Sequence, residues 1–165
     1  MSTATLSQSA CDEIDHWLTK YPAEHKQSAL LPALTLAQKE NGGYLTEALM
    51  DAVAAYLALP KITVYEAASF YSMYELKAVG KYKIEVCSNV SCKLCGAEKI
   101  INHIQQRLEV KTGETTADGK FTLREVECLA ACANAPMMQI GEQYYEDLTP
   151  EKVDQILQKL GEDLE

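Results

Sequence analysis

The segment Val86–Cys92, which reads VCSNVSC, has a later counterpart in Val126–Cys132, which reads VECLAAC. Each follows a short β-like run and holds two cysteines, with four residues between the first two and three between the second two. Small residues fill both loops, so backbone amides can approach the sulfur atoms and donate hydrogen bonds to them. Four thiols placed in two such loops indicate a metal site.

Several kinds of site use paired cysteines. A [2Fe–2S] cluster needs thiolates because soft sulfur ligands stabilise iron and its bridging sulfides. A structural zinc site is a second hypothesis, although its loops more often have two intervening residues. The C-x-x-C motif Cys92–Cys95 is formally that of a redox dithiol, but this role leaves three cysteines of the two pairs unexplained. Inert buried cysteines are the simplest alternative, and their placement after two strands argues against it.

The fifth cysteine of this region, Cys95, adds an ambiguity about the ligands. Cys87, Cys92 and Cys95 together have the spacing of plant-type ferredoxins. A ligand set of these three and one later cysteine would leave Cys128 or Cys132 idle, so the two pairs are the more economical set. Spacing alone leaves both sets open.

Composition limits the kinds of function. The chain has 165 residues, of which 47% are hydrophobic, and a formal net charge of −9. Such a charge argues against nucleic acid, whose phosphates attract Lys and Arg. The N-terminus lacks the pattern of a signal peptide, and no stretch is apolar enough to span a membrane. We therefore expect a soluble, cytoplasmic protein without direct membrane insertion, in which cysteines serve as ligands or core residues rather than disulfides.

The first half of the chain has helical periodicity. Apolar spacing predicts helices over residues 7–21 and 28–40, a third from a Thr46 cap to Pro60, and a fourth that begins at a capping box of Thr63 and Glu66. Cys11 lies on the apolar side of the first helix, where we expect it in the core. We also expect Phe70 in the core, whereas an interface role is a minority hypothesis for the nearby tyrosines. Residues 1–80 are therefore interpreted as a four-helix region.

The second half, residues 81–165, has a different pattern. Strands are predicted over 82–86 and 121–126, a hairpin over 137–145, and helices over about 94–110 and 149–161. The first of these helices starts just after Cys92, where its dipole would stabilise a negatively charged cluster. We interpret this half as a small sheet with helices packed on it, so the fold class is α+β or α/β.

Four stretches together carry a resemblance to a known family. They are CSNVSC (87–92), GETTADGKFTLREVECLAACANAPMMQI (113–140), LPALTLAQKENGGYL (31–45) and ITVYEAASFYSMY (62–74). They resemble the thioredoxin-like [2Fe–2S] ferredoxin subunit of respiratory complex I, the NADH–quinone oxidoreductase. The resemblance covers about residues 15–160 and implies an N-terminal helical bundle followed by a thioredoxin-like [2Fe–2S] domain.

The resemblance also implies a ligand set. It places the iron ligands of one [2Fe–2S] cluster at Cys87, Cys92, Cys128 and Cys132, with no catalytic residue in the chain, and leaves Cys95 outside the pattern. The family often has Gly where this chain has Ala130. Thioredoxin-like folds commonly have a cis proline at the position of Pro136, whose isomer the sequence leaves open.

The implied function is one-electron transfer within the NADH-oxidising module of the complex. The partners would be a larger subunit that binds FMN and NADH and other iron–sulfur subunits, in the peripheral arm of an inner-membrane-associated complex of the respiratory chain. The chain itself has no G-x-G-x-x-G after a strand, so we expect no NADH or flavin site on it. The equivalent diaphorase subunit of an NAD-linked hydrogenase or formate dehydrogenase shares these motifs. A thiol–disulfide oxidoreductase and a zinc-stabilised adaptor remain alternatives of other classes.

Overall fold

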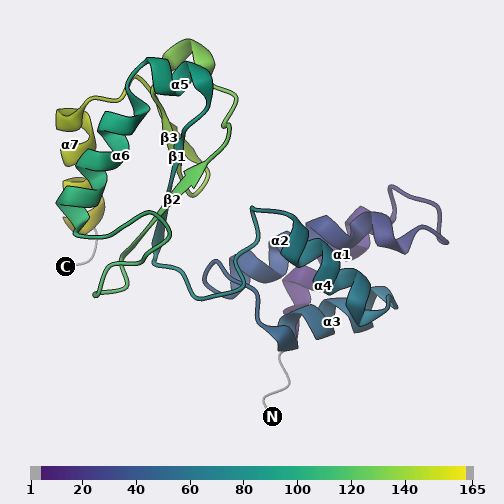
Figure 1. Cartoon of the computed structure of the whole chain (residues 1–165). Helices are drawn as coiled ribbons and strands as arrows, with labels where there is room; N and C mark the ends of the chain where they lie inside the picture. Colours follow the sequence, from purple (N-terminus) through teal and green to yellow (C-terminus); the bar gives the residue numbers. More distant parts are fainter. Residues whose placement is uncertain (1–4, 163–165) are drawn as a thin grey trace. The chain divides into compact units, whose positions relative to one another are not determined.

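A computed structural model describes residues 5–162 of the chain (Figure 1). The residues form two compact units that divide between Ala78 and Val79, and each unit has its own hydrophobic core. The first unit is helical and the second combines helices with a sheet, so the predicted fold class is confirmed. That residues 1–80 and 81–165 are separate folding domains stays a prediction.

The helical unit contains α1 (Gln8–Leu18), a 3₁₀ turn η1 (Lys26–Ala29), α2 (Leu30–Glu40), α3 (Glu47–Leu57) and α4 (Lys61–Phe70). Two hydroxyl side chains cap these helices. Ser7 accepts a hydrogen bond from the amide of Ala10, and Thr46 accepts one from the amide of Leu49. Capping satisfies amides that have no partner within the helix. The buried side chains of all these helices meet in one core, which includes Ile14, Leu34, Val53, Leu57 and Val64.

Three predictions for this unit are wrong. Helix α1 ends at Leu18 rather than near Tyr21. Helix α4 begins at Lys61, directly after Pro60, so Thr63 lies inside the helix and forms no capping box. A proline cannot donate a backbone hydrogen bond, which suits it to the position before a helix. Phe70 is 79% exposed rather than buried in the core. It is the last residue of α4, where the chain leaves the helix.

The second unit is built on a four-stranded sheet in the order β2-β1-β3-β4. Its strands are β1 (Tyr82–Cys87), β2 (Phe121–Val126), β3 (Met138–Ile140) and β4 (Gln143–Tyr145). Strands β1 and β2 are parallel, whereas β3 is antiparallel to both β1 and β4. The predicted hairpin with its turn at Gly141 and Glu142 is thereby confirmed.

Helices α6 (Ala97–Leu108) and α7 (Pro150–Glu162) pack side by side against the sheet (Figure 1). Thr149 caps α7 by accepting a hydrogen bond from the amide of Lys152. The core between the helices and the sheet consists of aliphatic side chains from both, among them Ile84, Val86, Ile104, Leu123 and Val153.

The helix predicted over about 94–110 is present as α6, but its start differs from the prediction. A short helix, α5 (Val90–Leu94), contains Cys92, and α6 begins only at Ala97. Between them Gly96 has φ +95°, a left-handed conformation that residues with a Cβ rarely adopt and that ends a helix. Cys92 therefore lies within a single helical turn, and the predicted position of its sulfur just before the N-terminus of a long helix is wrong.

Candidate metal centre

Three segments meet at one end of the sheet. Because β1 and β2 are parallel, their carboxyl ends lie side by side, and Cys87 is opposite Val126 in the register. The second cysteine loop starts immediately after Val126. Strand β3 runs the other way, so its first residue, Met138, lies opposite Val86 at the same end. The topology therefore brings both cysteine loops and the segment before β3 together.

Hydrogen bonds join these segments. The backbone N–H of Ser88 donates to the carbonyl oxygen of Val126 at 2.9 Å, and the Ser88 hydroxyl donates to the same oxygen at 3.3 Å. The N–H of Cys87 donates to the carbonyl oxygen of Met137 at 3.2 Å. The first cysteine loop is thus held on one side by β2 and on the other by the start of β3. The peptide bond between Ala135 and Pro136, just before this point, is cis.

The four cysteines of the two pairs differ in burial. The Cys87 and Cys92 side chains are buried, at 2% and 1% exposure, and pack with Ala97 and Met137 in a small core of their own. Cys128 and Cys132 are both exposed. The first pair therefore lies against the protein interior and the second pair at the surface.

The thiol of Cys87 contacts members of both pairs. Burial raises the pKa of this thiol, but hydrogen bonds from the amides of Asn89 and Leu129 and from the thiols of Cys92 and Cys128 act in the other direction, and the net pKa is lowered. Asn89 belongs to the first loop and Leu129 to the second. Backbone amides from both loops therefore stabilise negative charge on this sulfur.

Cys92 shows the opposite shift. Burial, followed by the hydrogen bond and the negative charge of Cys87, raises the pKa of the Cys92 thiol to about 11. The amide of Met137 opposes this shift, and the charge of Cys132 adds to it. Each buried cysteine therefore interacts with one exposed cysteine: Cys87 with Cys128, and Cys92 with Cys132.

Cys128 has a donor within its own loop. The backbone N–H of Ala130 donates to the Cys128 sulfur at an N–S distance of 3.3 Å. Ala130 has φ +60°, a left-handed backbone conformation that is uncommon for a residue with a side chain. Backbone amides of the two loops therefore donate to the sulfurs of Cys87 and Cys128, whereas the amide that supports Cys92 is that of Met137, outside the loops.

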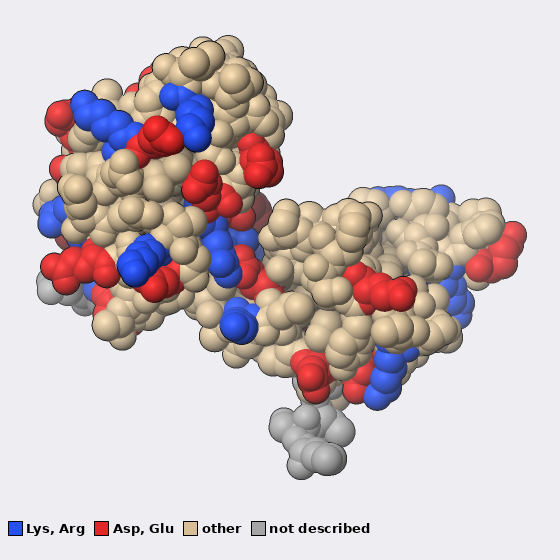
Figure 2. All heavy atoms as spheres, in the orientation of Figure 1, with Lys and Arg blue, Asp and Glu red and all other residues tan. Residues whose placement is uncertain are grey.

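Charged side chains are unevenly distributed around the thiols. Lys93 follows Cys92 and Glu127 precedes Cys128, whereas no residue from Cys128 to Gly141 carries a charged side chain. Figure 2 shows basic and acidic side chains over the α5 end of the second unit, next to a broad tan surface. Glu85, on β1, is paired with Lys83 at 2.9 Å. Backbone amides donate to the sulfurs of Cys87, Cys92 and Cys128 and stabilise negative charge there.

The donor set suits a [2Fe–2S] cluster, which takes four thiolates and benefits from amide donors to sulfur. Within residues 5–162, no three His, Cys, Asp or Glu side chains form a group able to hold a single metal ion. A two-iron cluster does not require such a group, because each iron takes two protein ligands. Cys95, in contrast, is exposed, and Cys11 is half-buried in α1 of the other unit.

Alternation over Met137 and Met138 predicts one side chain in the core and the other near the cluster loop, but the backbone contacts of Met137 with the site were not predicted. Its amide supports the Cys92 sulfur and its carbonyl oxygen accepts from the Cys87 amide. Both methionines are fully buried: Met137 packs with Cys87 and Cys92, and Met138 lies in the core of the sheet. Pro136, where a cis bond was an open question, is a second signal in the sequence for this segment.

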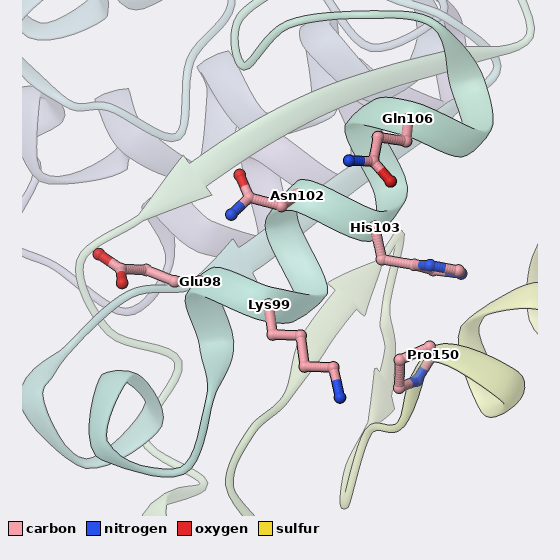
Figure 3. Close-up of a pocket in the computed structure, with 6 residues that line it drawn as sticks. All are labelled: Glu98, Lys99, Asn102, His103, Gln106 and Pro150. Carbon is pink, nitrogen blue, oxygen red and sulfur yellow. The ribbon is translucent and has the colours of Figure 1, made fainter.

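A separate depression of about 440 Å³ lies beside α6 and α7, and none of the cysteines lines it (Figure 3). His103, on its wall, forms a hydrogen bond of 3.0 Å with Asp154 of α7, which Arg107 also approaches at 3.3 Å. These contacts tie α6 to α7, so His103 has a structural role. Across the part of the chain that the structure describes, no helix has the length and apolar character needed to cross a membrane.

The chain is similar to named proteins over most of its length. It is 51% identical over 146 residues to the NADH-quinone oxidoreductase subunit designated E of Rickettsia conorii, which covers 88% of this chain and 87% of that protein. It is 47% identical over 137 residues to the mitochondrial NADH dehydrogenase [ubiquinone] flavoprotein 2 of Dictyostelium discoideum, over 83% of this chain and 56% of that one.

A solved structure shows the same fold. An NAD⁺-reducing [NiFe]-hydrogenase in the air-oxidized state superposes with a TM-score of 0.68 at 19% identity, over 80% of this chain and 23% of the hydrogenase chain. At this identity the likeness concerns the fold alone. The model of the thioredoxin-like [2Fe–2S] ferredoxin family matches residues 14–161, nearly the whole chain, and the chain belongs to that family.

Proposed function

We propose that this chain is the one-electron-carrying [2Fe–2S] subunit of the NADH-oxidising module of an NADH–quinone oxidoreductase. The cluster ligands in this proposal are Cys87, Cys92, Cys128 and Cys132. The family and the NADH-quinone oxidoreductase relatives support the proposal. The observation that carries it is the meeting of both cysteine loops at one end of the sheet, with the Cys87 thiol in contact with Cys92 and with Cys128.

When bound, a [2Fe–2S] cluster supplies a site that accepts and releases one electron at a time. The residues of the chain hold it and adjust its environment. Cys87 and Cys92 provide ligands from the protein interior, whereas Cys128 and Cys132 provide ligands at the surface, where an electron can enter or leave. The amides of Asn89, Leu129, Ala130 and Met137 stabilise negative charge on sulfur, which favours the reduced form.

The partner in this proposal is a larger subunit that binds FMN and NADH, together with other iron–sulfur subunits. The chain then takes part in an oxidoreductase without a nucleotide site of its own, and the complex would lie in the cytoplasm as the peripheral arm of an inner-membrane-associated assembly. The chain spans most of the relative from Rickettsia conorii, which supports an equivalent place in a complex.

The ligand assignment is tested by single substitutions. Cys87→Ala, Cys92→Ala, Cys128→Ala and Cys132→Ala should each lose most of the iron and acid-labile sulfide, because a cluster with three thiolates is exposed to hydrolysis. Cys95→Ala and Cys11→Ala are matched controls that should keep both. Loss of the cluster in Cys95→Ala would show that the ligand set is wrong.

Two measurements separate this function from its alternatives. Visible absorption, with an EPR signal on reduction, is expected for a [2Fe–2S] protein, whereas a zinc adaptor or a dithiol oxidoreductase is colourless. Native purification should bring along a flavin- and NADH-binding subunit and quinone-module subunits. Co-purification of a nickel or molybdenum subunit would instead assign the chain to the diaphorase of a hydrogenase or formate dehydrogenase.

A further inference from the structure

Two adjacent methionines follow the cis bond at Pro136, and both are fully buried. Met138 lies in the core between the sheet and its helices, whereas Met137 packs with Cys87 and Cys92 in the small core beside the cysteine loops. Successive residues of an extended segment point to opposite sides, so each core receives one methionine.

The composition of this small core makes the Met137 side chain important. Its other buried members contribute only two thiols and one methyl group, those of Cys87, Cys92 and Ala97. Among the described residues that are buried in this core, Met137 alone has a long side chain. Shortening it would leave a cavity next to both thiols, because a packed interior collapses only in part.

The backbone of Met137 fixes the place of its side chain against the thiols. The Met137 carbonyl oxygen accepts a hydrogen bond from the Cys87 N–H at 3.2 Å, and the Met137 amide supports the Cys92 sulfur. A substitution at this position keeps these backbone groups. The effect of the side chain can therefore be measured apart from that of the hydrogen bonds.

We propose that Met137 is a positioning residue for the proposed cluster: its side chain keeps water away from the buried sulfurs of Cys87 and Cys92 and so lowers the reduction potential. This inference rests on the proposed function, in which both sulfurs are ligands. The reduced cluster is the more negatively charged state, and a dry, apolar environment disfavours it. The Met137 side chain thus acts against the backbone amides, which favour reduction.

The test makes the same substitution at both methionines in the intact, cluster-containing chain. Met137→Ala should raise the reduction potential and should accelerate the loss of iron to a chelator about tenfold, the lower end of the usual effect of groups that surround a metal site. Met138→Ala is the matched control, because it removes an equally buried side chain from the other core. It should lower the free energy of unfolding and leave the potential unchanged.

Two further variants at Met137 complete the series. Met137→Leu conserves the volume of the side chain, so its potential should equal that of the parent protein. Met137→Val leaves a smaller cavity than Met137→Ala and should raise the potential less, and it decides the question if Met137→Ala holds no cluster.

The potential is measured by EPR-monitored redox titration, with the iron content determined for each variant. Pulsed EPR of the reduced protein in D₂O detects solvent deuterons close to the cluster. Their coupling should be stronger in Met137→Ala than in the parent protein, a change that loss of stability alone does not produce.

Two results would overturn the inference. One is a potential and a deuteron coupling like those of the parent protein in Met137→Ala or Met137→Val, with the cluster fully present. The other is an equal rise of the potential in Met138→Ala, which would make general loosening of the unit the cause. Neither result affects the proposed function, which fails if the parent protein lacks iron and acid-labile sulfide.

Discussion

The two cysteine pairs look equivalent in sequence and are not equivalent in the structure. Each pair follows a strand, yet Cys87 and Cys92 are buried beside Met137, whereas Cys128 and Cys132 are exposed. The difference arises because β1 lies between β2 and β3 in the sheet, while β2 is at the edge. A loop that leaves a central strand is covered from both sides, and a loop that leaves an edge strand is not. Position in the sheet, rather than the motif, therefore decides which of these cysteines face solvent.

The largest expected effect is on thiol reactivity in metal-free, reduced protein. Iodoacetamide should modify Cys128 and Cys132 quickly, together with the exposed Cys95. Cys87 and Cys92 should react about 100-fold more slowly, the ratio that about 3 kcal/mol of local opening produces. Peptide mapping by mass spectrometry measures each site, and denatured protein is the control in which all sites should react at similar rates. Equal rates in the folded protein would contradict the difference in burial.

A second prediction tests how closely the two strands that carry the cysteine loops approach each other. A Cβ on Gly80 would lie 2.9 Å from backbone atoms of Lys120 and Phe121, closer than real contacts allow. Gly80→Ala should therefore lower the free energy of unfolding by about 1–3 kcal/mol, the usual effect of overpacking. It should also reduce cluster occupancy, because β1 and β2 position both loops.

Gly161→Ala is the matched control for Gly80→Ala. It makes the same chemical change in α7, where a Cβ meets no other atom within 4 Å, so stability should stay the same or rise slightly. Urea denaturation of the two variants provides the measurement. A Gly80→Ala protein as stable as the parent would show that β1 and β2 do not approach so closely there.

The smallest effect concerns the metal-free fold. Cys87→Ala and Cys92→Ala remove a buried sulfur atom and should each lower the free energy of unfolding of the metal-free protein by about 1 kcal/mol. Cys128→Ala and Cys132→Ala remove exposed atoms and should change it by less than about 0.5 kcal/mol. Urea denaturation of the four metal-free variants measures these differences. An equal loss of unfolding free energy in all four variants would contradict the difference in burial between the two pairs.

Local signals in the sequence predicted much of the fold. Ser7 and Thr46 cap the helices expected there, alternation over residues 82–86 predicted β1 (Tyr82–Cys87), and Gly141 marked the hairpin turn. Each of these depends on residues a few positions apart, which are visible in a linear pattern. The failures have a different origin. The helix predicted to start near residue 94 starts only after the left-handed backbone of Gly96, and Phe70 is apolar but lies where no other element covers it.

The candidate site likewise has some features that follow from local sequence and others that do not. The sequence by itself determined that four thiols follow two strands within small, uncharged loops, because ligand type and spacing are local properties of the chain. Only the tertiary structure decided that one pair is buried and the other exposed, that Met137 supports the buried pair, and that Ala130 turns its amide toward Cys128. These features depend on strand order and backbone torsion, which arise when segments about forty residues apart pack against each other.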